Sequence, residues 1–149
     1  MSKQILLVDD EPHILRAAEI KLTRSGFTVR CAADGQQGWE MILQQKPDLL
    51  ITDLQMPRMD GLELARHVRE NPATADLPIL MLTARGLEAS LGEHAARLNV
   101  VTVLPKPFSP RELVLCVENA LGMRPVVCVG LLPTTRPAAT ATPTQSPGI

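Results

Sequence analysis

In the segment Ile5-Leu6-Leu7-Val8-Asp9-Asp10-Glu11-Pro12, an apolar run of strand length ends abruptly in carboxylates, and this pattern is the strongest indication of the fold. Its first four residues are aliphatic, as is typical of a strand that is covered on both faces of a sheet. A similar run, Leu49–Thr52, ends at Asp53, and a third, Ile79–Leu82, is followed by Thr83. Short apolar strands that end in polar residues therefore recur along the chain.

Five such runs alternate with five helical patterns. The remaining two are Thr28–Cys31, whose alternating pattern suits an edge strand, and Val100–Leu104. The helical patterns carry apolar residues three and four positions apart, and they begin near Ile14, Asp34, Leu62, Leu87 and Ser109. Strict alternation implies parallel strands that are joined by right-handed crossovers. The sequence therefore predicts an α/β fold with a doubly wound, five-stranded parallel sheet.

Sheets of this kind place their sites at the carboxyl ends of the strands. Asp9 and Asp10 follow the first predicted strand, Asp53 the third, Thr83 the fourth and Lys106 the fifth. Three carboxylates need compensation when they lie close together. Lys106 offers one positive charge, and a hard cation such as Mg²⁺ offers another, whereas the lack of histidine or cysteine at these ends argues against zinc. The pattern favours phosphoryl transfer, with Asp53 placed to form an acyl phosphate.

The charge balance excludes several classes of function. The chain has 15 basic and 16 acidic residues and a net charge of −1, which is a poor footprint for a nucleic-acid binder. No apolar run is long enough to span a membrane, and the first run is too short for a signal peptide. We therefore expect a cytoplasmic protein without nucleic-acid or membrane partners. Arg66, Arg69 and Glu70 are interpreted as an ordinary solvated face.

The composition changes after Gly122. Residues 3–122 are expected to form one domain, and residues 123–149 a tail rich in proline, threonine and alanine. Such a tail has too few apolar residues in a regular pattern to build a core, so it is expected to be disordered.

Four segments together resemble the receiver domain of bacterial two-component response regulators, over roughly Lys3 to Leu121. They are Ile5–Pro12, Asp53–Gly61, Leu82–Arg85 and Lys106–Phe108. The resemblance implies a flavodoxin-like sheet with strand order 2-1-3-4-5 and five flanking helices.

The resemblance also implies a role for each residue of the site. Asp53 matches the phosphorylated aspartate, and the expected Mg²⁺ (or Mn²⁺) ligands are the side chains of Asp9, Asp10 and Asp53 and the backbone carbonyl of Gln55. Thr83 matches the switch hydroxyl, Ala84 the small residue beside it, and Lys106 the phosphate-pairing lysine. Pro107 matches a proline whose preceding peptide bond is typically cis.

The sequence departs from the family pattern at the position of the switch aromatic. Receiver domains usually have tyrosine or phenylalanine three residues before the lysine, and here that residue is Val103. Pro105 also precedes Lys106 and is expected to stiffen the lysine loop. These changes put signal propagation in doubt more than phosphorylation.

The interpretation is a single-domain response regulator that accepts a phosphoryl group from a histidine kinase or a phosphotransfer protein and signals by altered protein binding. It is not expected to be an enzyme, and its kinase and downstream partner stay unnamed. The alternatives are a docking module that is never phosphorylated and an aspartate-based phosphatase. A phosphatase of that class would carry an acid where Gln55 stands. A flavin or nucleotide carrier is disfavoured because Asp9, Asp10 and Glu11 would repel phosphate without a metal.

Overall fold

A computed structural model describes residues 2–84 and 88–122 of the chain. In these residues five strands and five helices alternate in the order β1 (Gln4–Val8), α1 (Pro12–Arg24), β2 (Thr28–Ala32), α2 (Gly35–Gln44), β3 (Leu49–Asp53), α3 (Gly61–Glu70), β4 (Ile79–Ala84), α4 (Glu88–Arg97), β5 (Thr102–Lys106) and α5 (Pro110–Ala120). The predicted tail and the expected helix start at Leu87 lie outside the described residues. None of the described helices is long and apolar enough to cross a membrane.

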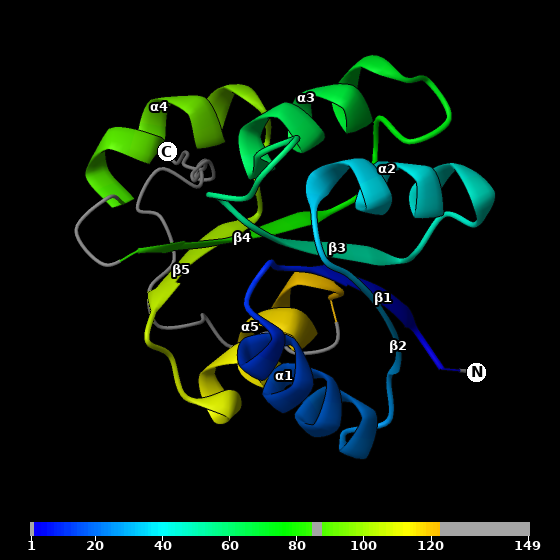
Figure 1. Cartoon of the computed structure of the whole chain (residues 1–149), viewed down its shortest axis with the longest axis vertical. Helices are drawn as coiled ribbons and strands as arrows, with labels where there is room; N and C mark the ends of the chain where they lie inside the picture. Colours follow the sequence, from blue (N-terminus) through cyan, green and yellow to red (C-terminus); the bar gives the residue numbers. More distant parts are fainter. Residues whose placement is uncertain (1, 85–87, 123–149) are drawn as a thin grey trace, which may run out of the picture.

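The strands form one parallel sheet in the order β2-β1-β3-β4-β5. Helices α1 and α5 cover one face, and α2, α3 and α4 cover the other (Figure 1). The prediction of a flavodoxin-like, doubly wound sheet is therefore confirmed. The helices expected to begin near Asp34 and Ser109 are capped by these residues, since the side chain of Asp34 accepts a hydrogen bond from the backbone N–H of Gln37 and Ser109 forms a capping box with Glu112.

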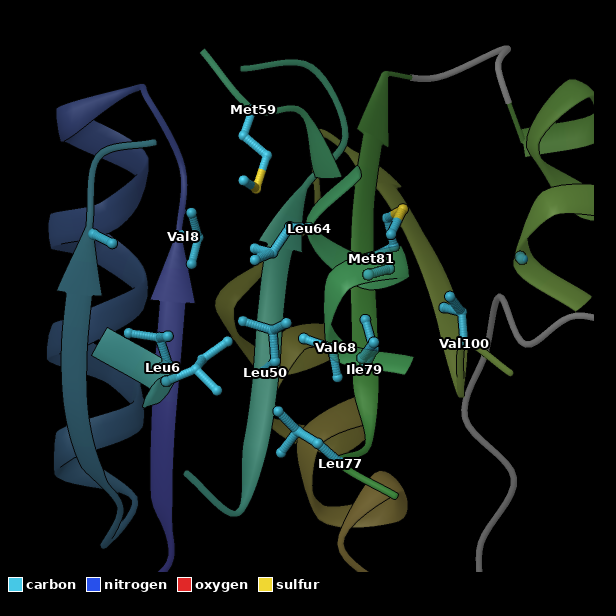
Figure 2. Close-up of a cluster of buried hydrophobic side chains, with 14 of the residues drawn as sticks. Leu6, Val8, Leu50, Met59, Leu64, Val68, Leu77, Ile79, Met81 and Val100 are labelled. Carbon is cyan, nitrogen blue, oxygen red and sulfur yellow. The ribbon is translucent and has the colours of Figure 1, made fainter. Parts of the chain in front are cut away.

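Two apolar cores lie on opposite faces of the sheet, because successive residues of a strand point to opposite sides. Along β1, Ile5 and Leu7 face the α1 and α5 side, whereas Leu6 and Val8 face the side of α2, α3 and α4. Figure 2 shows the second core, in which α3 side chains lie over the strands. Its labelled members are Leu6, Val8, Leu50, Met59, Leu64, Val68, Leu77, Ile79, Met81 and Val100.

The fifth strand begins two residues later than predicted. Val100 belongs instead to the end of α4, where Asn99 adopts a left-handed backbone with φ of 56°. The N–H of Val100 donates to the carbonyl of Ala95 at 2.9 Å, and the N–H of Asn99 donates to Ala96 at 3.2 Å. This pairing is a Schellman motif, in which apolar contact accompanies the hydrogen bonds. The apolar residue therefore ends a helix, although its pattern resembled the start of a strand.

The interpretation of Arg69 as a solvated residue is wrong. Its guanidinium donates hydrogen bonds to four backbone carbonyls, those of Ala75, Leu77, Leu98 and Asn99, at 2.9, 2.6, 2.7 and 3.2 Å. Two of these carbonyls lie in the segment before β4 and two at the end of α4. Arg69 thus joins the end of α3 to both segments.

Candidate functional site

The strand ends that carry polar residues lie side by side at one edge of the sheet. Asp53 is in register with Leu82 across β3 and β4, and Ala84 is in register with Lys106 across β4 and β5. Strand β1 lies on the other side of β3, so Asp9 and Asp10 emerge next to Asp53. The parallel topology therefore brings together residues that are far apart in the sequence.

Three aspartates form an acidic cluster at this edge. Oxygens of Asp9, Asp10 and Asp53 all lie within 4.8 Å of one another. Asp9 is fully buried and Asp53 is 6% exposed, whereas Asp10 is exposed. Backbone hydrogen bonds hold Asp9, because its N–H donates to Ala32 at 3.1 Å and its Oδ1 accepts from the N–H of Glu11 at 2.9 Å.

The ammonium of Lys106 is the main compensation for these charges within the described residues. Its Nζ lies 3.0 Å from Asp9 Oδ2, 3.3 Å from Asp53 Oδ1 and 2.8 Å from Glu11 Oε1. The peptide bond between Lys106 and Pro107 is cis. The contact with Glu11 was missed from the sequence, because a glutamate at the start of a helix reads as an ordinary first-turn acid.

The pKa values follow from burial and from this shared lysine. Burial and the charge of Asp9 raise the pKa of Asp53 to about 6, against the effect of Lys106. Burial also raises the pKa of Asp9, and the hydrogen bond from Lys106 lowers the pKa of Glu11. Although burial lowers the pKa of Lys106, its hydrogen bonds to Glu11 and Asp9 outweigh burial and raise that pKa. One ammonium thus offsets the repulsion between the two buried aspartates only in part.

The hydroxyl of Thr83 is buried and has no hydrogen-bond partner among the described residues. Buried polar groups without partners are rare, because desolvation costs about 1–3 kcal/mol when no hydrogen bond replaces water. Thr83 lies between Leu82 and Ala84, at the carboxyl end of β4. The hydroxyl is therefore available to a ligand that binds at this edge of the sheet.

The loop after Asp53 closes tightly back on the strand. The N–H of Gly61 donates to the carbonyl of Leu54 at 2.8 Å. A Cβ at Gly61 would overlap the carbonyl oxygen of Asp53, so this position requires glycine. Gln55 lies in the resulting loop, two residues beyond Asp53, and its side chain is exposed.

The donor atoms of the cluster suit a hard divalent cation. All are carboxylate oxygens, and the described residues add no histidine or cysteine to the group. Asp9 Oδ2 is buried and has no hydrogen bond apart from its ion-pair contact with Lys106. Mg²⁺ is held by one or two carboxylates together with water and phosphate oxygens. An acidic pocket of this composition fits Mg²⁺ or Mn²⁺ and does not fit zinc.

Residues 5–118 match the family described as the response regulator receiver domain. The chain belongs to this family. The receiver domain is 39% identical over 121 residues to the transcriptional regulatory protein SrrA of Staphylococcus aureus (strain NCTC 8325), and the match covers 81% of the chain and 48% of SrrA. The chain thus spans about half the length of the curated relatives it matches.

Solved structures give the same result. The receiver domain is similar to a candidate response regulator from Chloroflexus aurantiacus J-10-fl, with a TM-score of 0.77 and 38% identity, over 82% of this chain and 99% of that one. It is also similar to the chemotaxis response regulator CheY4 of Vibrio cholerae, with a TM-score of 0.76 and 28% identity, over 80% of this chain and 99% of that one. Membership in the family places the chain in two-component signalling.

Most of the predicted site residues lie together at the carboxyl ends of the strands, at one edge of the sheet. Oxygens of Asp9, Asp10 and Asp53 lie within 4.8 Å of one another, Lys106 pairs with Asp9 and Asp53, and Thr83 lies at the neighbouring strand end. Val103 is placed differently, because it is 2% exposed and belongs to the core on the side of α2, α3 and α4. The position of the usual aromatic is therefore filled by a small, fully packed side chain.

Proposed function

We propose that Asp53 accepts a phosphoryl group from a phosphohistidine donor in a Mg²⁺-dependent step. The observation that carries the proposal is the position of Lys106, whose ammonium lies 3.3 Å from Asp53 and 3.0 Å from Asp9. A cation held over a carboxylate among other carboxylates is suited to a product that adds further negative charge. Because Lys106 pairs with three acids, its positive charge is already held at the site before a phosphoryl group arrives.

In this step a carboxylate oxygen of Asp53 attacks phosphorus, and the P–N bond of the donor breaks. The products are an acyl phosphate on Asp53 and a neutral histidine on the donor, after that histidine takes up a proton. Lys106 pairs with one phosphoryl oxygen, and Thr83 donates its free hydroxyl to another. A bound Mg²⁺, held by Asp9, Asp10, Asp53 and the carbonyl of Gln55, would neutralise the remaining charge.

The donor is proposed to be a histidine kinase or a phosphotransfer protein. A depression of about 610 Å³ lies beside the acidic cluster, and its lining includes Lys106, which pairs with Asp9 and Asp53, together with Glu11 and Ala84. Its other walls are mostly apolar side chains of α1, of the segment that follows β5 and of the start of α5: Ile14, Ala17, Ala18, Pro107, Phe108, Pro110 and Leu113, together with His13. A protein that docks its apolar surface here would present a phosphohistidine next to Asp53.

The domain is proposed to act as a stoichiometric acceptor and not as an enzyme that turns over substrate. The output is a change in affinity for a protein partner at the face formed by α4, β5 and α5. A shift of this kind requires only a few kcal/mol of differential binding between the two states.

Intact-mass measurement after incubation with acetyl phosphate tests the proposal. We expect one phosphoryl adduct per chain with Mg²⁺, none with EDTA, and none in Asp53→Asn. Asp76→Asn is the matched control, because Asp76 is exposed and pairs only with Lys46 among the described residues. An adduct that persists in Asp53→Asn would place the acceptor elsewhere, and no adduct in the wild type would favour the docking module.

A second variant separates donor docking from chemistry. Ile14→Asp puts a charge into the apolar depression without touching the acidic cluster. It should keep labelling by acetyl phosphate while slowing transfer from any histidine kinase that phosphorylates the wild type. Equal loss with both donors would contradict the proposed docking surface.

A further inference from the structure

The loop between β3 and α3, residues 54–60, is attached to the rest of the domain at two points. At its base, the N–H of Gly61 donates to the carbonyl of Leu54. At its tip, the guanidinium of Arg58 donates to Asp34 Oδ2 through Nη2 at 2.7 Å and through Nε at 3.2 Å. Gln55 lies between these two points, so its backbone position depends on both.

Contacts other than the one with Arg58 also hold Asp34 in place. Its side chain is 6% exposed, and its Oδ1 accepts a hydrogen bond from the N–H of Gln37 at 2.8 Å, at the start of α2. Arg58 has a left-handed backbone with φ of 69°, which is unfavourable for a residue with a long side chain. A rigid, charged acceptor therefore holds a loop residue in a conformation that it would not adopt readily by itself.

The segment that carries Asp34 also contacts the strand end on the other side of the acidic cluster. Asp34 follows the end of β2, where the carbonyl of Ala32 accepts the N–H of Asp9 at 3.1 Å. The next residue, Gly35, packs so closely on the loop that a Cβ there would overlap the carbonyl oxygen of Met59. The segment 32–35 thus contacts both the strand end that carries Asp9 and the loop that carries Gln55.

We propose that Arg58 is a positioning residue for the Mg²⁺ site, which acts by fixing the loop that carries the backbone carbonyl of Gln55. Asp34 is its anchor, and neither residue is one of the proposed Mg²⁺ ligands. This inference rests on the proposed function, because it requires that the acidic cluster binds Mg²⁺. Contacts of this outer kind commonly change metal affinity by about tenfold or more when they are removed.

A simpler explanation predicts a different result. If Arg58 and Asp34 act only through their charges, removal of the positive charge should strengthen Mg²⁺ binding and removal of the negative charge should weaken it. Positioning predicts weaker binding in both cases. Arg58→Asn and Asp34→Asn distinguish the two explanations, because asparagine tolerates a left-handed backbone at 58 and can still cap α2 at 34.

The test is calorimetric titration of Mg²⁺ into the full chain, together with thermal unfolding of each variant. We expect both substitutions to weaken Mg²⁺ binding by about tenfold, the lower end of the range for outer contacts. The double variant should lose no more affinity than the single variant that binds Mg²⁺ less tightly. Arg66→Asn is the control, since Arg66 is an exposed arginine of α3 that only reaches Glu63 and Glu70 among the described residues, at 4.0 and 3.9 Å.

The outcomes separate this inference from the proposed function. A wild type that binds no Mg²⁺ would overturn both. Normal binding in the wild type with unchanged or tighter binding in Arg58→Asn would overturn the positioning role alone, as would additive losses in the double variant. Arg58→Asn is expected to fold, because the side chain of Arg58 is 73% exposed, so a folded variant is available even if Asp34→Asn unfolds.

Discussion

The acidic cluster should destabilise the metal-free domain, and Asp53→Asn should relieve this cost. Burial and the Asp9 charge raise the pKa of Asp53 from 3.8 to about 6. A shift of about two pKa units corresponds to about 3 kcal/mol when the carboxylate is ionised. Asparagine resembles the protonated acid in shape and cannot ionise. The variant should therefore unfold with a free energy about 2–3 kcal/mol larger than the wild type at pH 7.5.

The gain should depend on pH in a defined direction. Below pH 3.8 the carboxyl of Asp53 is protonated in the folded and the unfolded chain, so ionisation costs nothing. Between pH 3.8 and about 6 the unfolded chain releases this proton first, and the stability of the wild type falls as the pH rises. Above about pH 6 the stability of the wild type carries the full cost of ionising Asp53 in the folded domain. The advantage of Asp53→Asn should thus shrink to about 1 kcal/mol at pH 4.5.

Urea unfolding in EDTA at pH 4.5 and pH 7.5 measures both values. The wild type and Asp53→Asn are compared with Asp76→Asn, which changes an exposed aspartate and should not reproduce the gain. The reasoning is refuted if Asp53→Asn is no more stable than the wild type at pH 7.5, or if its advantage is the same at both pH values. A gain that disappears when Mg²⁺ is added would show that the ion offsets the same repulsion.

Three further substitutions test other parts of the structure. Thr83→Val should stabilise the domain by about 1 kcal/mol in urea unfolding, because it removes a buried hydroxyl without a partner, while it should impair switching on phosphorylation. Arg69→Met should cost about 2–4 kcal/mol by the same assay, through loss of four hydrogen bonds, whereas Arg66→Met should cost little. Val103→Tyr should destabilise the domain by about 1–3 kcal/mol through overpacking, and in binding assays it should alter partner affinity more than the phosphorylation rate in acetyl phosphate.

The strand ends could be predicted because they depend on patterns that are local in the sequence. Aliphatic runs such as Ile5–Val8 are strands only if both faces are covered, and strict alternation with helices then dictates parallel pairing. That pairing places Asp9, Asp53 and Lys106 at one edge without any knowledge of side-chain contacts. The sequence was therefore sufficient to predict which residues come together at the site.

The contacts of charged side chains could not be predicted in the same way. Arg58, Arg69 and Glu11 all lie in segments where a solvated charge is the ordinary expectation. Their partners are a carboxylate in a distant loop, backbone carbonyls of two other segments, and a lysine 95 positions away. Only tertiary structure brings such partners within reach. The start of β5 was misplaced for a related reason, because Val100 satisfies an apolar pattern while it ends a helix.

The packing of Val103 constrains how phosphorylation can be signalled. A tyrosine at this position can exchange between buried and exposed positions, but a valine that is 2% exposed among core side chains gains nothing by moving outward. The end of α4 is held by the Schellman motif and by Arg69, which donates to Leu98 and Asn99. A change at Thr83 must therefore reach the α4–β5–α5 face through movement of backbone, either of β5 or of the opposite end of α4. The proposed response to phosphorylation is therefore expected to use a shift of whole elements and not the rotation of one side chain.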